Sequence, residues 1–349
     1  MTGPTVLSVA YPFAPVGPDP VGGAEQILTR LDRAVVEAGG RSVVMAVEGS
    51  QPAGELIALP RVDGEVDGAA RRTVHERLRA LLAKAVAEVR PDVVHLHGID
   101  FDAYLPDAGP PVVATLHLPL DWYAPGALRP VRPNTWLVPV SRRQAGDAAV
   151  DTRLLPPIEN GVEVESFAPD RKRGYAFALG RICPEKGFHL ALDAAKAAGR
   201  PMVLAGEVFP YAAHRAYFEQ EIAPRLDRAR RWAGPVAGAH KRHLLAAARC
   251  LLVPSLCEET SSLVAREALA AGTPVIAFAR GALPEVVEHG RTGFLVKDVH
   301  DMAQALNRVD DLDPDDCRDT ARARFSARAM TDAYLALYRR LAAEAVRAL

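Results

Sequence analysis

Short apolar runs alternate along this chain with longer segments in which apolar residues recur every three or four positions. Short apolar runs bounded by glycine and proline are typical of buried strands in parallel sheets, and the longer period indicates amphipathic helices. The predicted strands are 5–11, 41–47, 93–97, 112–117, 135–141, 175–181, 201–206, 249–254 and 275–278. This alternation in two successive blocks predicts an α/β protein with two doubly wound domains.

A proline- and glycine-rich stretch separates the two blocks. Pro156-Pro157 and Asn160-Gly161 indicate a turn into a linker, and we place the domain boundary between residues 167 and 168. The second domain then spans 168–329. Residues 330–349 form a final predicted helix with an apolar face, which carries Tyr334, Leu337, Tyr338 and Leu341.

Composition excludes several classes of protein. The chain has 349 residues, 49% of them hydrophobic, and a formal net charge of -1, which argues against nucleic-acid binding by counterion release. Residues 1–16 lack a basic segment typical of a signal peptide, and no apolar run approaches the ~20 residues of a membrane span. The four cysteines show no zinc-ligand spacing, so we expect reduced thiols and a cytoplasmic protein. Basic clusters such as 171–173 and 228–231 are interpreted as solvated faces, with membrane-surface docking as the alternative.

The polar loop after residue 254 is the first candidate site. A helix is predicted to begin near Ser261, with Thr260 or Ser261 as its N-cap, and a helix N-terminus after a parallel strand suits a phosphate. Glu259 precedes this N-terminus and Glu267 lies inside the helix. Carboxylates beside an anion site are suited to sugar hydroxyls, and a nucleoside diphosphate sugar offers both groups. The alternative is that both glutamates are merely solvated charges.

The turn 180–187, G-R-I-C-P-E-K-G, is the second candidate site. Arg181 and Lys186 stand five residues apart across a Gly/Pro turn, and two such cations can hold both phosphates of a diphosphate. The chain contains only six lysines, which argues against an incidental surface lysine at position 186. Two solvated loop charges are the alternative.

Three features of the first domain carry weaker signals. Gly22-Gly23 opens a helix after the first strand and is either a phosphate cradle or a simple turn. His117 ends a strand, where it faces a ligand crevice in open α/β sheets or is held by a loop carbonyl. His95 and His97 share one face of a strand, and we interpret them as core histidines rather than metal ligands. We likewise discount the D-x-D motif Asp100-Phe101-Asp102, which lacks a matching strand context.

The motifs together resemble glycosyltransferase family 4. The resemblance rests on Glu259-x7-Glu267, on E-A-L-A-A-G-T-P-V-I-A, on G-x-x-P-E-V-V-E-H-G-R-T-G-F-L-V and on G-R-x-x-x-x-K-G, and it extends over nearly the whole chain. It implies the GT-B fold, in which two Rossmann-like domains face each other and the C-terminal helix crosses back to the first. One departure concerns the donor-sugar pocket, because Thr260-Ser261-Ser262 replaces the family's usual Gly-Phe-Gly.

The resemblance also implies roles for individual residues. His117, Glu259, Arg181 and Lys186 are the implied catalytic residues: the two cations stabilise the leaving diphosphate, Glu259 holds hexose hydroxyls and His117 lies at the reacting sugar. Glu267 is expected on the ribose and Val236 at the base. The implied donor-binding set comprises Gly22, Gly23, Gly180, Val236, Ser261, Ser262, Leu263 and Glu267.

These residues predict a retaining transferase that moves a hexose from a nucleoside diphosphate sugar, UDP in preference to GDP, to an acceptor hydroxyl without a metal or other cofactor. The expected partners are the nucleotide sugar and an acceptor, which is a lipid, a metabolite or a polymer. Two alternatives stay open: a nucleotide-sugar epimerase or hydrolase, and a non-catalytic sugar-nucleotide-binding protein. A nicotinamide dehydrogenase is disfavoured because no G-x-G-x-x-G follows the first strand, and no Walker A motif is present.

Overall fold

The computed structural model describes residues 3–18, 20, 22–62, 68–149, 152 and 154–347. The chain forms two compact units, residues 1–160 with 328–349, and residues 161–327. The predicted boundary at 167–168 differs from this division because residues 161–167 belong to the second unit. There, the Val162 amide donates to the Phe325 carbonyl at 2.8 Å, and the Ala327 amide donates to the Val162 carbonyl at 2.9 Å.

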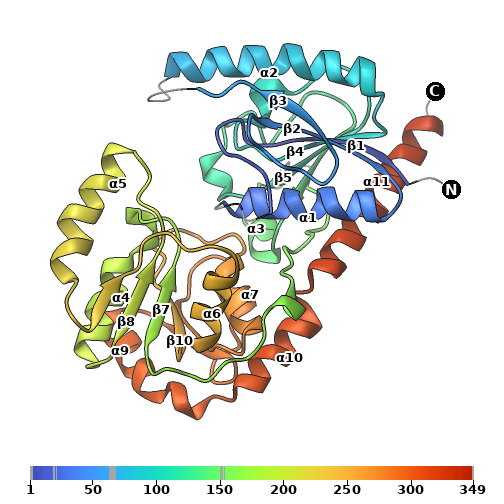
Figure 1. The fold of residues 1–349 in the computed structure, drawn as a ribbon. Helices are drawn as coiled ribbons and strands as arrows, with labels where there is room; N and C mark the ends of the chain where they lie inside the picture. Colours follow the sequence, from blue (N-terminus) through green and yellow to red (C-terminus); the bar gives the residue numbers. More distant parts are fainter. Residues whose placement is uncertain are drawn as a thin grey trace. The chain divides into compact units, whose positions relative to one another are not determined.

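The first unit is built on a parallel sheet of six strands in the order β3-β2-β1-β4-β5-β6 (Figure 1). The strand order reverses between β1 and β4, and open α/β sheets bind ligands at the carboxyl ends of the strands beside such a reversal. The edge strand β3 was not predicted, because four of its five residues are not buried and it lacks a buried apolar run. The strands are β1 (Thr5–Val9), β2 (Arg41–Val47), β3 (Glu55–Leu59), β4 (Val93–Leu96), β5 (Val112–Leu116) and β6 (Thr135–Pro139).

Alternate residues of β2 show why both faces of this sheet are covered. Val43 and Met45 pack in one cluster with residues of α2, whereas Val44 and Ala46 pack in another cluster with Leu28 of α1. Successive strand side chains point to opposite faces, so a central strand needs apolar residues at every position. The helices of this unit are α1 (Gly23–Glu37), α2 (Gly68–Val89), α3 (Arg142–Gly146) and α11 (Ala327–Arg347), with 3-10 turns η1 (Phe101–Tyr104) and η2 (Leu120–Trp122).

The C-terminal helix α11 packs within the first unit, although its sequence follows the second. Its predicted apolar face is buried, since Tyr334, Leu337, Tyr338 and Leu341 are each at most 7% exposed. The Tyr338 hydroxyl lies 2.6 Å from His95 Nδ1, so α11 contacts the central strand β4 of this unit.

The second unit repeats the design with a parallel sheet in the order β12-β11-β10-β7-β8-β9. The order reverses between β7 and β10, so the loops after these two strands are the expected ligand-binding segments. The strands are β7 (Ala176–Leu179), β8 (Met202–Ala205), β9 (Arg230–Trp232), β10 (Cys250–Val253), β11 (Val275–Phe278) and β12 (Gly293–Val296).

Helices cover both faces of the second sheet as well. On β10, Leu252 packs in one cluster with residues of α4 and α9, whereas Leu251 packs in another with residues of α7. The helices are α4 (Phe188–Ala197), α5 (Ala212–Tyr217), α6 (Gly238–Ala247), α7 (Leu263–Ala270), α8 (Leu283–Val286), α9 (Val299–Arg308) and α10 (Pro314–Arg324). Shorter helical turns are η3 (Val164–Ser166), η4 (Pro184–Lys186), the π-helical η5 (Phe218–Ile222), η6 (Ala223–Arg225) and η7 (Val309–Asp311).

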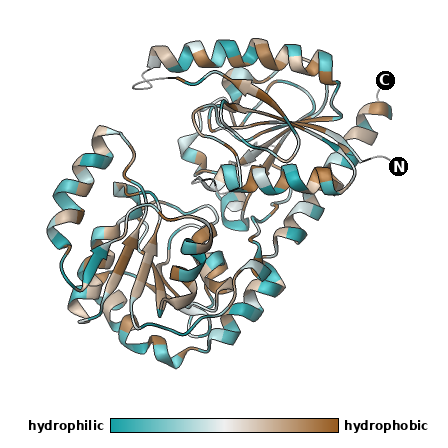
Figure 2. Cartoon of the chain, viewed as in Figure 1, coloured by the Kyte–Doolittle hydropathy of each residue, from teal (hydrophilic) through white to brown (hydrophobic). Residues whose placement is uncertain are grey.

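Hydropathy follows these layers. Figure 2 colours most strands of both sheets brown to tan, whereas the flanking helices alternate between teal and brown. Within the described part of the chain, no helix is both long enough and apolar enough to cross a membrane. The two doubly wound α/β units agree with the predicted fold class.

Candidate functional site

The turn between β7 and α4 carries Arg181 and Lys186, the two cations that the sequence assigned to a diphosphate. Arg181 is exposed, and Lys186 ends the 3-10 turn η4. Gly187 follows in the left-handed region at φ +62°, where a Cβ atom would lie 2.3 Å from the Pro254 carbonyl oxygen. Only glycine permits both this backbone conformation and this approach. The Lys-Gly pair therefore brings the ammonium group of residue 186 close to the end of β10.

Lys186 and Glu259 form a largely buried ion pair. Lys186 Nζ lies 2.5 Å from Glu259 Oε1, and Ser255 Oγ donates to the same oxygen at 2.5 Å. The Glu259 side chain is 9% exposed and that of Lys186 26%. Burial by itself would raise the pKa of Glu259, but the charge of Lys186 and the two hydrogen bonds outweigh it, so this pKa is lowered. The carboxylate is therefore charged, and the structure brings together two residues that the sequence assigned to one site.

A second ion pair involves Glu267, in the second turn of α7. Its Oε1 atom lies 2.8 Å from Lys241 Nζ, and the two side chains are 4% and 18% exposed. Sequence reasoning did not assign Lys241 to the site; this residue lies near the start of α6, which begins at Gly238. The solvated-charge alternative for both glutamates is wrong, since each is buried and paired.

The segment between the two glutamates turns sharply into α7. Ser262 is the N-cap at φ +49°, and its side chain makes no capping hydrogen bond. The predicted caps, Thr260 and Ser261, are therefore wrong. The side-chain oxygens of Ser261 and Ser262 are buried without a hydrogen-bond partner among the described residues. The helix starts at Leu263, and since the first amides of a helix have no partner within it, this end is suited to an anion.

Two residues that sequence reasoning did not identify support this turn. Arg266 is 0% exposed; its Nε donates to the Ser261 carbonyl at 3.2 Å, and its guanidinium lies 4.5 Å from the centre of the Phe325 ring. Gly281 has φ +55°, and a Cβ atom there would lie 2.2 Å from the Glu259 carbonyl oxygen. Glycine at this position lets residues 281–282 lie against the backbone of Glu259.

Gly180 and Val236, which the sequence assigned to donor binding, lie in loops after β7 and β9. The Gly180 amide donates to the Ala205 carbonyl at 3.2 Å, continuing the pairing of β7 with β8. Val236 is half-buried in the loop between β9 and α6, where it packs against the same hydrophobic cluster as Leu263. The family resemblance implies a strand and turn over residues 232–238, whereas β9 ends at Trp232, so Val236 is a loop residue.

In the first unit, His117 follows β5 and belongs to a buried histidine network. His117 Nε2 lies 3.0 Å from His97 Nδ1, while His95 contacts the Tyr338 hydroxyl and, at 2.7 Å, the Thr115 hydroxyl. Burial lowers the pKa of both His95 and His117 to about 3, so these rings are neutral. Because both nitrogens of His95 are occupied, the interpretation of the H-x-H pair as core histidines is supported for that residue.

The remaining first-unit candidates lie at helix starts. Gly22 is the extended N-cap of α1, and Gly23 is the first residue of that helix.

Asp100 accepts from the Tyr104 hydroxyl at 3.2 Å and lies 2.6 Å from His75 Nε2, so the discounted D-x-D motif serves packing between α2 and η1.

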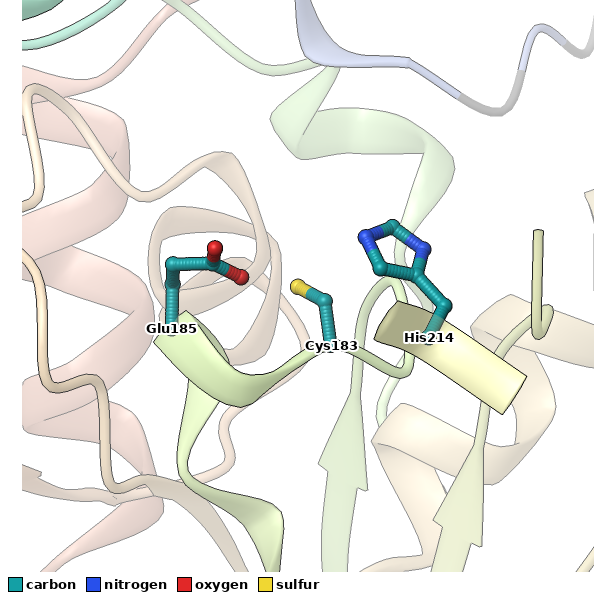
Figure 3. Close-up of side chains that lie close together, drawn as sticks. All are labelled: Cys183, Glu185 and His214. Atoms are coloured by element: carbon teal, nitrogen blue, oxygen red, sulfur yellow. The ribbon is translucent and has the colours of Figure 1, made fainter. Parts of the chain in front are cut away.

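A group of metal-ligand type also lies in the second unit. One ligand atom each from Cys183, Glu185 and His214 lies within 4.8 Å of the others (Figure 3). Burial raises the pKa of the Cys183 thiol to about 11. All four cysteines of the chain are free thiols, as predicted.

Comparison with known proteins identifies the family. Residues 21–148 match the family model described as Glycosyltransferase Family 4, and residues 173–310 match that described as Glycosyl transferases group 1. D-inositol 3-phosphate glycosyltransferase from Nocardioides sp. is 29% identical over 265 residues, covering 74% of this chain and 49% of the relative. The enzyme of the same name from Mycobacterium tuberculosis is 33% identical over 223 residues, which cover 56% of this chain and 45% of that relative. The matches thus span about half the length of these relatives.

Solved structures show the same fold across the chain. Sucrose-phosphate synthase from Thermosynechococcus elongatus superposes with a TM-score of 0.80 at 20% identity, covering 97% of this chain and 99% of that one. The Anabaena HepE protein in complex with UDP-glucose gives a TM-score of 0.71 at 19% identity, covering 99% of both chains. With its two parallel six-stranded sheets the chain has the GT-B fold, and its two units match the models of glycosyltransferase family 4 and of glycosyl transferases group 1.

Proposed function

We propose that this protein transfers a hexose from a UDP-hexose to an acceptor hydroxyl, with retention of anomeric configuration and without a metal in the transfer step. The observation that carries the proposal is the pairing of Lys186 with Glu259 at the start of α7, where one cation, one carboxylate and a helix N-terminus meet. A nucleoside diphosphate sugar presents phosphates, which suit the cation and the amides, and hydroxyls, which suit the carboxylate.

The relatives support the class of donor. The Anabaena HepE protein has been crystallised with UDP-glucose and with UDP, and it shares the fold over nearly its whole length. The curated relatives are glycosyltransferases of D-inositol 3-phosphate. We therefore take a UDP-hexose as the donor and include an inositol phosphate among the acceptors to be tested.

In the proposed reaction, the bond between the anomeric carbon and the diphosphate oxygen breaks, and its electron pair stays on the phosphate. Arg181, Lys186 and the backbone amides at the start of α7, near Ser261, Ser262 and Leu263, stabilise that charge. Removing one electrostatic group of this kind typically lowers the rate by ~10²–10³-fold. The acceptor oxygen bonds to the anomeric carbon on the same face, and its proton passes to the departing phosphate oxygen.

Donor binding is proposed to exchange partners within the site. Lys186 turns from Glu259 to a phosphate oxygen, which releases the Glu259 carboxylate to accept hydrogen bonds from hexose hydroxyls. Glu267, which Lys241 holds in place, accepts from the ribose hydroxyls. Gly180 and Val236 are assigned to the donor nucleotide, Gly22 and Gly23 to its phosphates, and His117 to the reacting sugar.

The test is an NMR assay of the purified chain with UDP-glucose, EDTA and a panel of hydroxyl acceptors that includes D-inositol 3-phosphate. We expect UDP release coupled to an α-linked product. We also expect Lys186→Ala and Glu267→Ala to weaken donor binding, and His117→Ala to bind donor but lose turnover. A β-linked product would contradict retention, and transfer that occurs only when EDTA is left out would contradict metal independence. Release of free hexose or an epimer without any transfer would favour the hydrolase or epimerase alternative.

A further inference from the structure

The side chains of Cys183, Glu185 and His214 converge from two segments of the second unit. Cys183 and Glu185 belong to the turn after β7, and His214 belongs to α5 (Figure 3). One potential ligand atom from each lies within 4.8 Å of the other two. The thiol of Cys183 is buried, His214 is half-buried and Glu185 is exposed, so the group reaches from the interior to solvent.

We propose that these three side chains form a binding site for a thiophilic divalent cation of the zinc class. The sulfur of Cys183, an oxygen of Glu185 and a ring nitrogen of His214 are the protein ligands. Three protein ligands leave a fourth position of a tetrahedral ion for water, as in zinc sites that are not closed by protein alone.

One polar atom of the group has no protein partner, which supports its role as a ligand to an ion. His214 Nδ1 is buried and has no hydrogen-bond partner among the described residues. A buried polar atom without a partner is destabilising, and a bond to a metal ion would satisfy it. The Cys183 thiol donates a hydrogen bond to the Arg181 carbonyl at 3.5 Å and interacts with the Glu185 side chain, so it would exchange these weak bonds for a bond to the ion.

The surroundings also orient the His214 ring. The rings of Tyr211 and His214 meet edge to face with centroids 5.1 Å apart, and the centroid of Phe209 lies 6.4 Å away. Such packing lowers the entropy lost when the imidazole binds an ion.

The ligand types select the class of ion. Calcium and magnesium prefer several oxygen ligands, and this group supplies one carboxylate beside the positive charge of Arg181. Thiolate and imidazole ligands instead form strong bonds to zinc and related ions. Zinc bond lengths of about 2.0–2.3 Å place ligand atoms about 3–4 Å apart. The three ligand atoms lie within 4.8 Å of one another, so they need to approach only slightly to bind one ion.

This site is separate from the proposed chemistry. The transfer step does not run through the ion, and the test below reads metal binding alone. An ion held here would tie the turn that carries Arg181 and Lys186 to α5, because its ligands come from both segments.

The experiment titrates Co²⁺, and in parallel Zn²⁺, into the full chain after chelator treatment and dialysis. We expect one Co²⁺ per chain with a thiolate-to-cobalt charge-transfer band and visible bands of a four-coordinate ion, and a rise in thermal midpoint with Zn²⁺. Cys183→Ser should remove the charge-transfer band. His214→Gln and Glu185→Gln should each weaken Zn²⁺ binding at least tenfold.

Cys257→Ser is the matched control, because Cys257 is a partly exposed thiol outside the group. It should keep both the band and the affinity. Absence of stoichiometric binding to the wild-type chain would overturn the site, as would a band that survives in Cys183→Ser. If Cys183→Ser fails to fold, as judged by circular dichroism, the His214→Gln and Glu185→Gln affinities decide: values equal to wild type reject the site.

Discussion

Lys186 Nζ lies 2.5 Å from Glu259 Oε1, and this contact joins two motifs that are 73 residues apart in the sequence. One motif is the turn after β7 and the other is the loop after β10, the two strands between which the sheet order reverses. Without a ligand, the cation and the carboxylate that we assign to the donor neutralise each other. The proposed exchange of partners therefore requires donor binding to separate this ion pair.

Removing one partner of this pair should destabilise the protein more than removing both. Lys186→Met leaves the Glu259 carboxylate buried without its cation. Breaking a fully buried pair costs about 3–5 kcal/mol, and we expect about 2–3 kcal/mol here, because the Lys186 side chain is 26% exposed. In the double variant Lys186→Met/Glu259→Leu, more than half of this loss should be recovered. Urea unfolding measures both values, and a double variant no more stable than the single one would contradict the account.

The glycine that supports Glu259 allows a second test. Gly281→Ala adds a Cβ atom 2.2 Å from the Glu259 carbonyl oxygen, in addition to straining a residue at φ +55°. Gly199→Ala is the matched control, because Gly199 has φ +62° and nothing within 4 Å of the added atom. We expect Gly199→Ala to cost about 1 kcal/mol in unfolding free energy, and Gly281→Ala to cost clearly more and to weaken UDP binding. Equal losses in both variants would show that residue 281 does not position the Glu259 loop.

The buried histidines of the first unit predict acid sensitivity. Burial lowers the pKa of His95 from 6.5 to about 3, and it lowers that of His97 well below 6.5. Below pH 6.5, the unfolded chain binds protons that the folded unit cannot accept at these sites. The stability they contribute is therefore fully present above pH 6.5 and is lost as the pH falls from 6.5 toward 3. Well inside this pH range, each of the two histidines should lower the free energy of unfolding by about 1.4 kcal/mol for every unit by which the pH falls.

Tryptophan fluorescence in the Trp232→Phe background reports unfolding of the first unit, which contains Trp122 and Trp136. His97→Gln should reduce the pH slope by the share of one histidine, whereas substitution of the exposed His300 by glutamine should leave the slope unchanged. Stability of the wild-type unit that stays constant between pH 7 and pH 5 would contradict neutral buried histidines.

Much of the architecture was predictable because apolar runs and turn residues carry its strands. The strands Arg41–Val47 and Val275–Phe278 were predicted with the correct bounds, and the other predicted strands lie within two residues at each end. The edge strands β3 and β12 were not predicted: β3 is largely exposed and needs no apolar run, and β12 is only four residues long. Motifs likewise identified Lys186, Glu259 and Glu267, but their contacts depend on how distant loops meet, which periodicity does not specify.

The residues that were missed share one property: their roles come from tertiary contacts. Lys241 lies near the start of a helix whose beginning has no strong cap signal, so the sequence did not show that it would contact Glu267. Arg266 resembles an ordinary helix-surface arginine in sequence, yet it is fully buried against Phe325. His214 lies 31 positions after Cys183, and their proximity arises only when α5 folds over the turn.

The most direct test of the central claim is a thermal-shift panel in EDTA with UDP, GDP, dTDP and their hexose conjugates, run on the wild-type chain and on Lys186→Ala. A ligand at 100 times its Kd stabilises the folded state by about 2.7 kcal/mol, which is readily measured. We predict stabilisation of the wild-type chain by UDP and UDP-hexose, and a much smaller shift for Lys186→Ala. If no nucleoside diphosphate stabilises the folded wild-type chain, or if Lys186→Ala responds as the wild type does, the assignment of this ion-paired loop to a nucleotide-sugar donor is wrong.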